Sequence, residues 1–147
     1  MFKFSLEPVL ALKEKVEDSK KRELGEATMY QERIYQEKLI LEKKKDEALI
    51  EARVGENQFV DVSAIKVFNY YNQFISQSIE AKGKDLETAK MQVEEKRNEL
   101  LEAVKERKIL DNLKAIHKEV FIEEEKRDEQ RIMDDIVTYR FGRKERE

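Results

Sequence analysis

Residues that break helices are almost absent from this chain of 147 residues, which contains one proline and four glycines. Ser5 followed by Pro8 is typical of a helix start, because the first-turn amides of a helix need no acceptor within it. Gly55 is suited to end a helix, and Asp61 or Ser63 is suited to cap the next one. The few breakers therefore predict two long helices joined by one short connection.

We expect the first helix over about 6–54, a turn over about 55–61 and a second helix over about 62–141. A short connection makes consecutive helices antiparallel neighbours. The expected fold is all-α, a long antiparallel two-helix coiled coil (an α-hairpin) that forms a single elongated domain over 1–147. Its working surfaces are expected at the two ends.

The second helix is expected to be much longer than the first. If the turn is centred near residue 58, Leu6 lies opposite about residue 110, and residues 111–141 overhang without an intramolecular partner. This overhanging C-terminal helix still carries apolar residues, and an unpaired helix with apolar positions is suited to bind something else. They are Leu113, Ile116, Val120, Phe121, Ile132, Ile136 and Val137.

Composition supports long helices over a compact globule. Charged residues make up 43% of the chain and hydrophobic residues 39%, without tryptophan or cysteine. A globular core of this length normally draws on more apolar residues, whereas this balance is typical of coiled coils. The net charge of −3 is mixed along the chain, which argues against a nucleic-acid partner. No apolar run is long enough to span a bilayer and no signal peptide is recognised, so we expect a soluble cytoplasmic protein.

An apolar stripe at coiled-coil spacing is expected on each helix. In the first helix, Lys13 and Lys20 interrupt a seven-residue series, and Leu10 and Leu24 lie on the neighbouring series. That first-helix series comprises Leu6, Ala27, Ile34, Leu41 and Ala48. The second-helix stripe comprises Phe68, Ile75, Ile79, Leu86, Val93, Arg97, Leu100 and Val104.

No catalytic or cofactor constellation is present. His117 is the single histidine, and its phase along the second helix favours a structural role at the seam. The acidic run 123–125 lacks the spacing of a calcium loop and is interpreted as a solvated helix face. No phosphate-binding glycine motif occurs. We therefore expect no enzyme activity, no cofactor and no metal.

Aromatic residues cluster between residues 59 and 74. Phe68 falls on the seam, but Tyr70 and Phe74 project away from it, and Ala81 lies beside them. Exposed aromatics next to a small residue suggest a docking surface, and contacts inside a dimer or tertiary fold are an alternative of equal weight. The cluster comprises Phe59, Phe68, Tyr70, Tyr71 and Phe74.

The N-terminal stretch FKFSLEPVL is a second apolar segment. Its apolar residues suit a membrane contact, but few basic residues accompany them before Lys13, so membrane binding is disfavoured. Packing of Phe2 and Phe4 against the second helix, or insertion into a partner, is the favoured interpretation.

Four motifs together resemble one known family. The first is F-x-F-x-L-x-x-V-L-x-L-K-E at the start of the chain, and YNQFI over 71–75 is the second. The others are VEEKRNELLEAVKERKILDNLK over 93–114 and EKRDEQRIMDDIVTYR over 125–140. In this order and over nearly the whole chain, they resemble the FliJ family.

The resemblance implies a non-enzymatic stalk of the flagellar type III export apparatus, similar in fold to the central shaft of rotary ATP synthases. It implies binding within a FliI-type hexameric ATPase, which promotes ring assembly. It further implies contact with the cytoplasmic domain of an FlhA-type export gate, and handling of export chaperones. Location at the membrane is then peripheral, through these partners.

The resemblance also implies which residues meet each partner. Phe74 and Ala81 match the gate-docking patch of the family, whereas its leucine is replaced by Ser78 and its histidine by Asp85. The expected gate residues are Tyr70, Tyr71, Phe74 and Ala81. The expected ATPase-ring residues are Phe2, Phe4, Phe121, Ile132 and Ile136.

Two other readings remain open. One is the equivalent stalk of a virulence type III secretion system, which differs in its partners and not in its physics. The other is a generic dimerising coiled-coil scaffold, which predicts a stable dimer with the 111–141 region in intermolecular contact.

Overall fold

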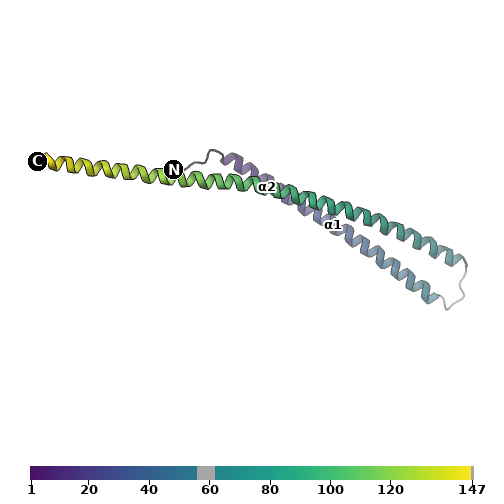
Figure 1. The fold of residues 1–147 in the computed structure, drawn as a ribbon. Helices are drawn as coiled ribbons and strands as arrows, with labels where there is room; N and C mark the ends of the chain where they lie inside the picture. The colour runs from purple at the N-terminus through teal and green to yellow at the C-terminus, as the bar shows by residue number, and fades with distance from the viewer. Residues whose placement is uncertain (56–61, 147) are drawn as a thin grey trace. The chain divides into compact units, whose positions relative to one another are not determined.

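The computed structural model describes residues 1–55 and 62–146. They form two α-helices, α1 over Glu7–Gly55 and α2 over Val62–Glu145, and no strand occurs among them (Figure 1). The helices pack against each other and run antiparallel, because residues later in α1 pair with residues earlier in α2. The ion pairs are Glu7–Lys114, Lys20–Glu99 and Glu37–Lys82. The predicted all-α helical hairpin is confirmed.

Helix α1 begins one residue later than a Ser5 cap requires. The Glu7 amide donates to the Phe4 carbonyl oxygen at 3.1 Å, and the Leu10 amide donates to the Leu6 carbonyl oxygen at 2.9 Å. Leu6 thus occupies the cap position and Pro8 lies in the first turn, where its missing N–H costs nothing. Glu7 provides the favourable acidic charge at this end.

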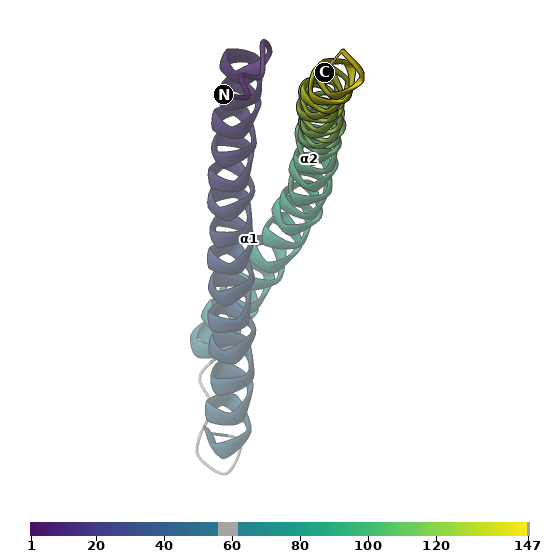
Figure 2. The ribbon, with the colours of Figure 1, turned by 90° about the vertical axis from the view of Figure 1, so that its left-hand side faces the viewer.

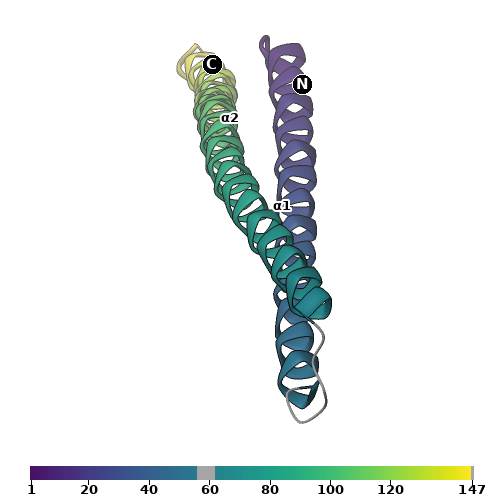
Figure 3. The same cartoon turned by 90° about the vertical axis from the view of Figure 1, so that its right-hand side faces the viewer.

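Helix α2 extends further than predicted at its C-terminal end. It passes through Gly142 and ends at Glu145. Figure 3 draws α2 as a coiled ribbon that continues to the yellow C-terminal end. One glycine costs a helix only about 1 kcal/mol, and Arg143 and Lys144 in the last turn favour helix through its dipole. At the other end Ser63 lies inside the first turn and not before it. Asp61, Phe59 and most of the predicted turn lie outside the described residues.

The chain divides into two compact units. The terminal unit comprises Met1–Glu17 with Glu102–Glu147, and the inner unit comprises Asp18–Leu101. Each unit contains parts of both helices, and each has its own buried side chains. The organisation as one elongated domain over 1–147 stays a prediction.

The core of the inner unit is narrow. Ile34 of α1 packs with Leu86 and Ala89 of α2, and all three are buried. Ile75 and Val93 continue the buried stripe along α2. A stripe of this width buries one face of each helix and leaves the remaining faces in water.

The seam on α2 follows steps of three and four residues. It runs through Ala89, Val93, Lys96 and Leu100, which are buried or half-buried, whereas Arg97 is exposed. The prediction that Arg97 lies on the seam is wrong. A step of four from Ala89 to Val93 must be followed by a step of three to keep the average of 3.5 that faces a partner helix.

The terminal unit is held by aromatic contacts at its open end. The Phe2 and Phe121 ring centroids lie 5.6 Å apart, and the Phe4 ring meets the His117 ring edge-on at 5.7 Å. Figure 2 shows the non-helical residues that precede α1 near the N-terminus. Extended chain advances about 3.3 Å per residue against 1.5 Å in a helix, so these residues cover more of α2 than a helix would.

The unpartnered part of α2 therefore begins later than predicted. Residues 111–121 are not an overhang, because Lys114 pairs with Glu7 at 2.8 Å and Phe121 meets Phe2. Every described residue from Ile122 onward is exposed. We name residues 122–146, which include the end of α2, the free segment.

Candidate protein-binding surfaces

Lysines at seam positions link the two helices of the inner unit. Lys82 of α2 donates to Glu37 of α1 at 2.5 Å, and Lys96 of α2 donates to Glu23 of α1 at 3.3 Å. These hydrogen bonds lower the pKa of both carboxyls and raise the pKa of both lysines. The aliphatic part of each lysine can cover the seam while the ammonium group reaches its edge.

A lysine of α1 also pairs with a glutamate of α2. Lys20 of α1 donates to Glu99 of α2 at 3.1 Å, which raises the pKa of Lys20 and lowers that of Glu99. Lys20, predicted as an interruption of the stripe, is thus a cross-helix contact. Because these side chains contact each other at the seam, the outward faces of both helices are available to bind partners.

The terminal unit contains a buried carboxylate at its seam. Glu17 is 6% exposed and accepts a hydrogen bond from the Arg107 guanidinium. Arg107 also donates to Asp111 at 2.5 Å. The hydrogen bond to Glu17 raises the pKa of Arg107. A buried charge left without its partner is costly, so this group favours one pairing of the helices.

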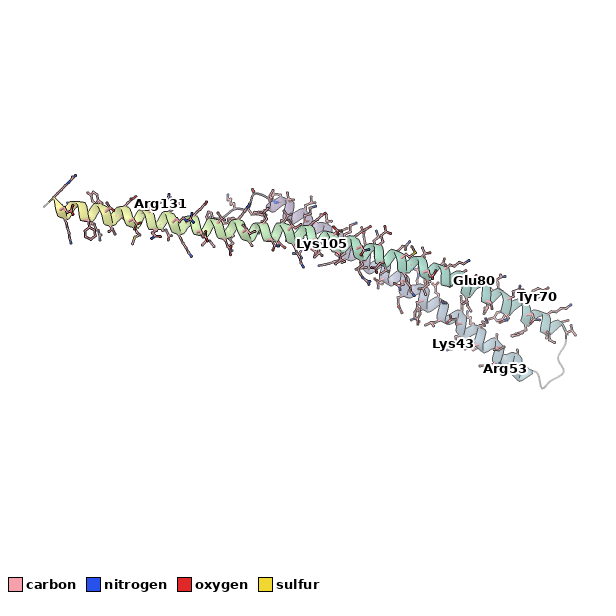
Figure 4. All side chains as sticks on the ribbon, in the orientation of Figure 1. Lys43, Arg53, Tyr70, Glu80, Lys105 and Arg131 are labelled. Atoms are coloured by element: carbon pink, nitrogen blue, oxygen red, sulfur yellow. The ribbon has the colours of Figure 1, made fainter. Side chains whose placement is uncertain are left out.

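Four predicted gate residues form an exposed surface on α2, which we name the aromatic surface: Tyr70, Tyr71, Phe74 and Ala81. Tyr70 is 73% and Phe74 66% exposed, whereas the adjacent Ile75 is 3% exposed and faces α1. Figure 4 labels Tyr70 near the start of α2. The aromatic rings therefore contribute little to the core of the unit.

Ser78 lies inside the aromatic surface, and its hydroxyl is turned to the backbone. It donates to the Phe74 carbonyl oxygen at 3.0 Å. This bond satisfies the hydroxyl locally, so its place between Phe74 and Ala81 does not require a polar partner.

The terminal unit holds the five residues predicted to meet the ATPase ring, which we name the terminal surface. The Phe2 ring meets the Phe121 ring, and the Phe4 ring meets the His117 ring, four residues earlier on α2. Phe4 is buried, while Phe2 and Phe121 are half-buried. Ile132 and Ile136 lie further along α2 and are exposed.

A family model described as the flagellar FliJ protein matches residues 2–146. The chain belongs to the FliJ family. The searches of curated proteins and of solved structures give no match. Membership assigns this chain to the flagellar export apparatus, as a stalk protein of that assembly.

Sequence reasoning missed two residues of this FliJ family member near the aromatic surface. Val67 is as exposed as Phe74 and belongs to the same seven-residue series, which runs Val67, Phe74, Ala81. Extending that series by one step would have found it. Ile40 of α1 is also exposed and lies three residues after Glu37, on the side where Glu37 meets Lys82.

Sequence reasoning also missed part of the free segment. Tyr139 and Phe141 are exposed there, as is Met133. A shallow hollow lies along Ile132, Asp135, Ile136, Tyr139, Arg140 and Arg143. The spacing of Ile132, Ile136 and Tyr139 by four and three residues is the signal that identifies this face.

The FliJ family chain shows no clustered metal ligands among its described residues. Within the same residues, neither helix has a stretch long and apolar enough to cross a bilayer. Glu123, Glu124 and Glu125 are exposed on α2.

Proposed function

We propose that this chain is a non-enzymatic stalk that binds a FliI-type hexameric ATPase and an FlhA-type export gate. It promotes assembly of the ATPase ring and couples ATP hydrolysis to export. The family match over residues 2–146 is the observation that carries this proposal. The protein is cytoplasmic and is held at the inner face of the membrane through its partners, with export chaperones as further partners.

The terminal surface is the side proposed to meet the ATPase. Its exposed members Ile132 and Ile136 project from a helical segment that has no partner in the described chain. An exposed helix with apolar positions one turn apart is suited to a groove or channel lined by another protein. The contacts of Phe2 with Phe121 and of Phe4 with His117 keep the first residues beside α2.

The aromatic surface is proposed to meet the gate. Tyrosine and phenylalanine supply large contact areas at low entropic cost and are enriched at binding hot spots. Ala81 leaves room for a partner side chain beside Phe74. The replacements Ser78 and Asp85 change the chemistry of this contact from that of the family pattern, so Phe74 is expected to be its centre.

The coupling proposed here is mechanical. Side chains of α2 belong to both surfaces, and cross-helix ion pairs such as Lys82–Glu37 and Lys96–Glu23 hold α2 against α1. A packed helix pair resists twisting and bending, so it can bias the conformations of a ring bound to it. The chain then needs no active site of its own.

Binding assays with the two purified partners test this function. The chain is expected to bind the isolated ATPase and the isolated gate domain separately, and to increase the ATPase rate by promoting ring formation. Failure to bind either partner would contradict the proposal. Turnover of a substrate by the chain alone would contradict its non-enzymatic character.

The match to a flagellar family favours the flagellar apparatus over a virulence secretion system. Sedimentation distinguishes the stalk from the other alternative, a scaffold that functions as a stable dimer. At the dilute concentrations of a binding assay, the stalk is expected to be monomeric.

A further inference from the structure

We propose that the free segment 122–146 pairs weakly with the same segment of a second copy, in antiparallel orientation. The pairing itself requires only this chain. Its consequence, that the second copy covers Ile132 and Ile136 and so competes with the ATPase, rests on the proposed function.

One face of the free segment carries the proposal. Six residues on α2 follow one another in steps of four and three, which places them on a single face of a helix. All six are exposed, with Ile132 at 59%, Ile136 at 46% and Tyr139 at 70%. In chain order they are Glu125, Glu129, Ile132, Ile136, Tyr139 and Arg143. We name them the free face.

The free face is complementary to itself when two copies run in opposite directions. Ile132 of one copy then lies opposite Ile136 of the other, and Glu125 lies opposite Arg143. Glu129 lies opposite Tyr139, whose hydroxyl can donate to the carboxylate. Every layer of the pair is therefore apolar, ionic or hydrogen-bonded.

The order of residues along the free face selects this register. A sliding of one helix by a full heptad would instead set Ile132 against Arg143 or against Glu129. Charge and apolar order thus select one antiparallel register.

A parallel pair is disfavoured by the same residues. It would set Glu125 and Glu129 against their own copies at one end, and Arg143 against its own copy at the other. Like charges placed directly opposite each other destabilise a helix pair. None of these three makes an ion pair with another described residue, so their charges are available to a second copy.

The dimer is expected to be weak. Three apolar residues per copy give an interface well below the roughly 1,200–2,000 Å² of stable complexes. Much of the attraction is ionic and exposed, and added salt screens such pairs. Association should therefore appear at high protein concentration and disappear at high salt.

Sedimentation velocity of the full chain tests the pairing. The weight-average sedimentation coefficient is expected to rise with protein concentration at about 50 mM salt and to stay constant at about 500 mM. Arg143→Glu should weaken association by about tenfold, and the double variant Glu125→Arg with Arg143→Glu should restore it. A concentration-independent coefficient, or no recovery in the double variant, would overturn the proposal.

Arg127→Glu is the matched control. It makes the same charge change, but Arg127 lies two residues from both Glu125 and Glu129 and so points away from the free face. Association of this variant should stay within about twofold of the unmodified chain. An equal loss in both variants would show a net-charge effect and reject the specific face.

Cysteine cross-linking tests the orientation, because the chain contains no cysteine. A mixture of Glu129→Cys and Tyr139→Cys chains should form disulfide dimers faster than either variant alone. Faster cross-linking within one variant would indicate parallel pairing and contradict the proposal. ATPase binding measured at dilute concentration, where the chain is monomeric, tests the proposed function separately.

Discussion

Phe74 and Ile75 are neighbours in the sequence but have opposite surroundings. Phe74 projects into solvent, whereas Ile75 is buried against α1. Truncation of Phe74 to alanine should therefore weaken binding to the gate domain by about tenfold or more. Its melting temperature should stay within about 1–2 °C of the unmodified chain, because little packing is lost. Calorimetric titration against the gate domain and thermal melting measure the two effects.

Ile75→Ala is the matched control. Removal of a buried isoleucine side chain costs about 2–4 kcal/mol, so this variant should melt earlier. A large fall in melting temperature for Phe74→Ala would show that Phe74 belongs to the core and that its assignment to a surface is wrong.

The carboxyl groups of Glu23, Glu37 and Glu99 make stability depend on pH. Folding lowers their pKa values, because each accepts a hydrogen bond from a lysine of the other helix. The folded chain thus binds fewer protons than the unfolded chain at acidic pH. Their contribution is complete above the ordinary glutamate pKa and is lost as pH falls from that value through the lowered ones. The melting temperature, measured over a series of decreasing pH values, should decrease within this pH range.

Replacement of all three glutamates by glutamine should flatten that acidic decline. The partner lysines have raised pKa values, so their contribution persists below the ordinary lysine pKa and is lost as pH rises through the raised values. An unchanged acid decline in the triple variant would assign the effect to other groups.

The sequence predicted the seam residues better than the contacts between them. Ile34, Ile75, Leu86 and Val93 follow from spacing alone and are buried. The link between Lys20 and Glu99 depends on which residues of the two helices lie opposite each other, and spacing within one helix does not contain that information.

At the scale of the helices, Gly25 is a weak point in the middle of α1. A methyl group added there meets no other atom within 4 Å, and the residue is exposed. Gly25→Ala should stabilise the chain by about 0.5–1 kcal/mol, since alanine loses less backbone entropy in a helix. Thermal melting should shift upward by about 2–5 °C. No shift would indicate that α1 is not helical at this position in solution.

Helix existence followed from the lack of breakers, while the helix ends did not. Gly142 was expected near the end of the second helix, but one glycine is too weak a breaker to stop α2 before Glu145. Phe121 was expected to be unpartnered, but the non-helical residues before α1 bring Phe2 to it. How far the N-terminal residues extend along α2 depends on their backbone conformation, which residue spacing does not reveal.

At the scale of the whole molecule, each compact unit is proposed to bind one partner. The terminal surface and the aromatic surface have different compositions and lie in different units. A substitution in one surface should therefore weaken binding to one partner and leave binding to the other partner unchanged. Ile136→Glu should impair ATPase binding and leave gate binding unchanged, and Phe74→Ala should do the reverse. Loss of both activities in either folded variant would argue for one shared surface.

The central claim is that one chain can hold both partners at the same time. Light scattering after size exclusion of the ATPase, the gate domain and this chain measures it directly. We expect a complex whose mass includes all three proteins, and no joint complex of the ATPase and the gate domain when both Ile136→Glu and Phe74→Ala are present. Displacement of the ATPase by the gate domain, with only two-protein complexes observed, would contradict the claim.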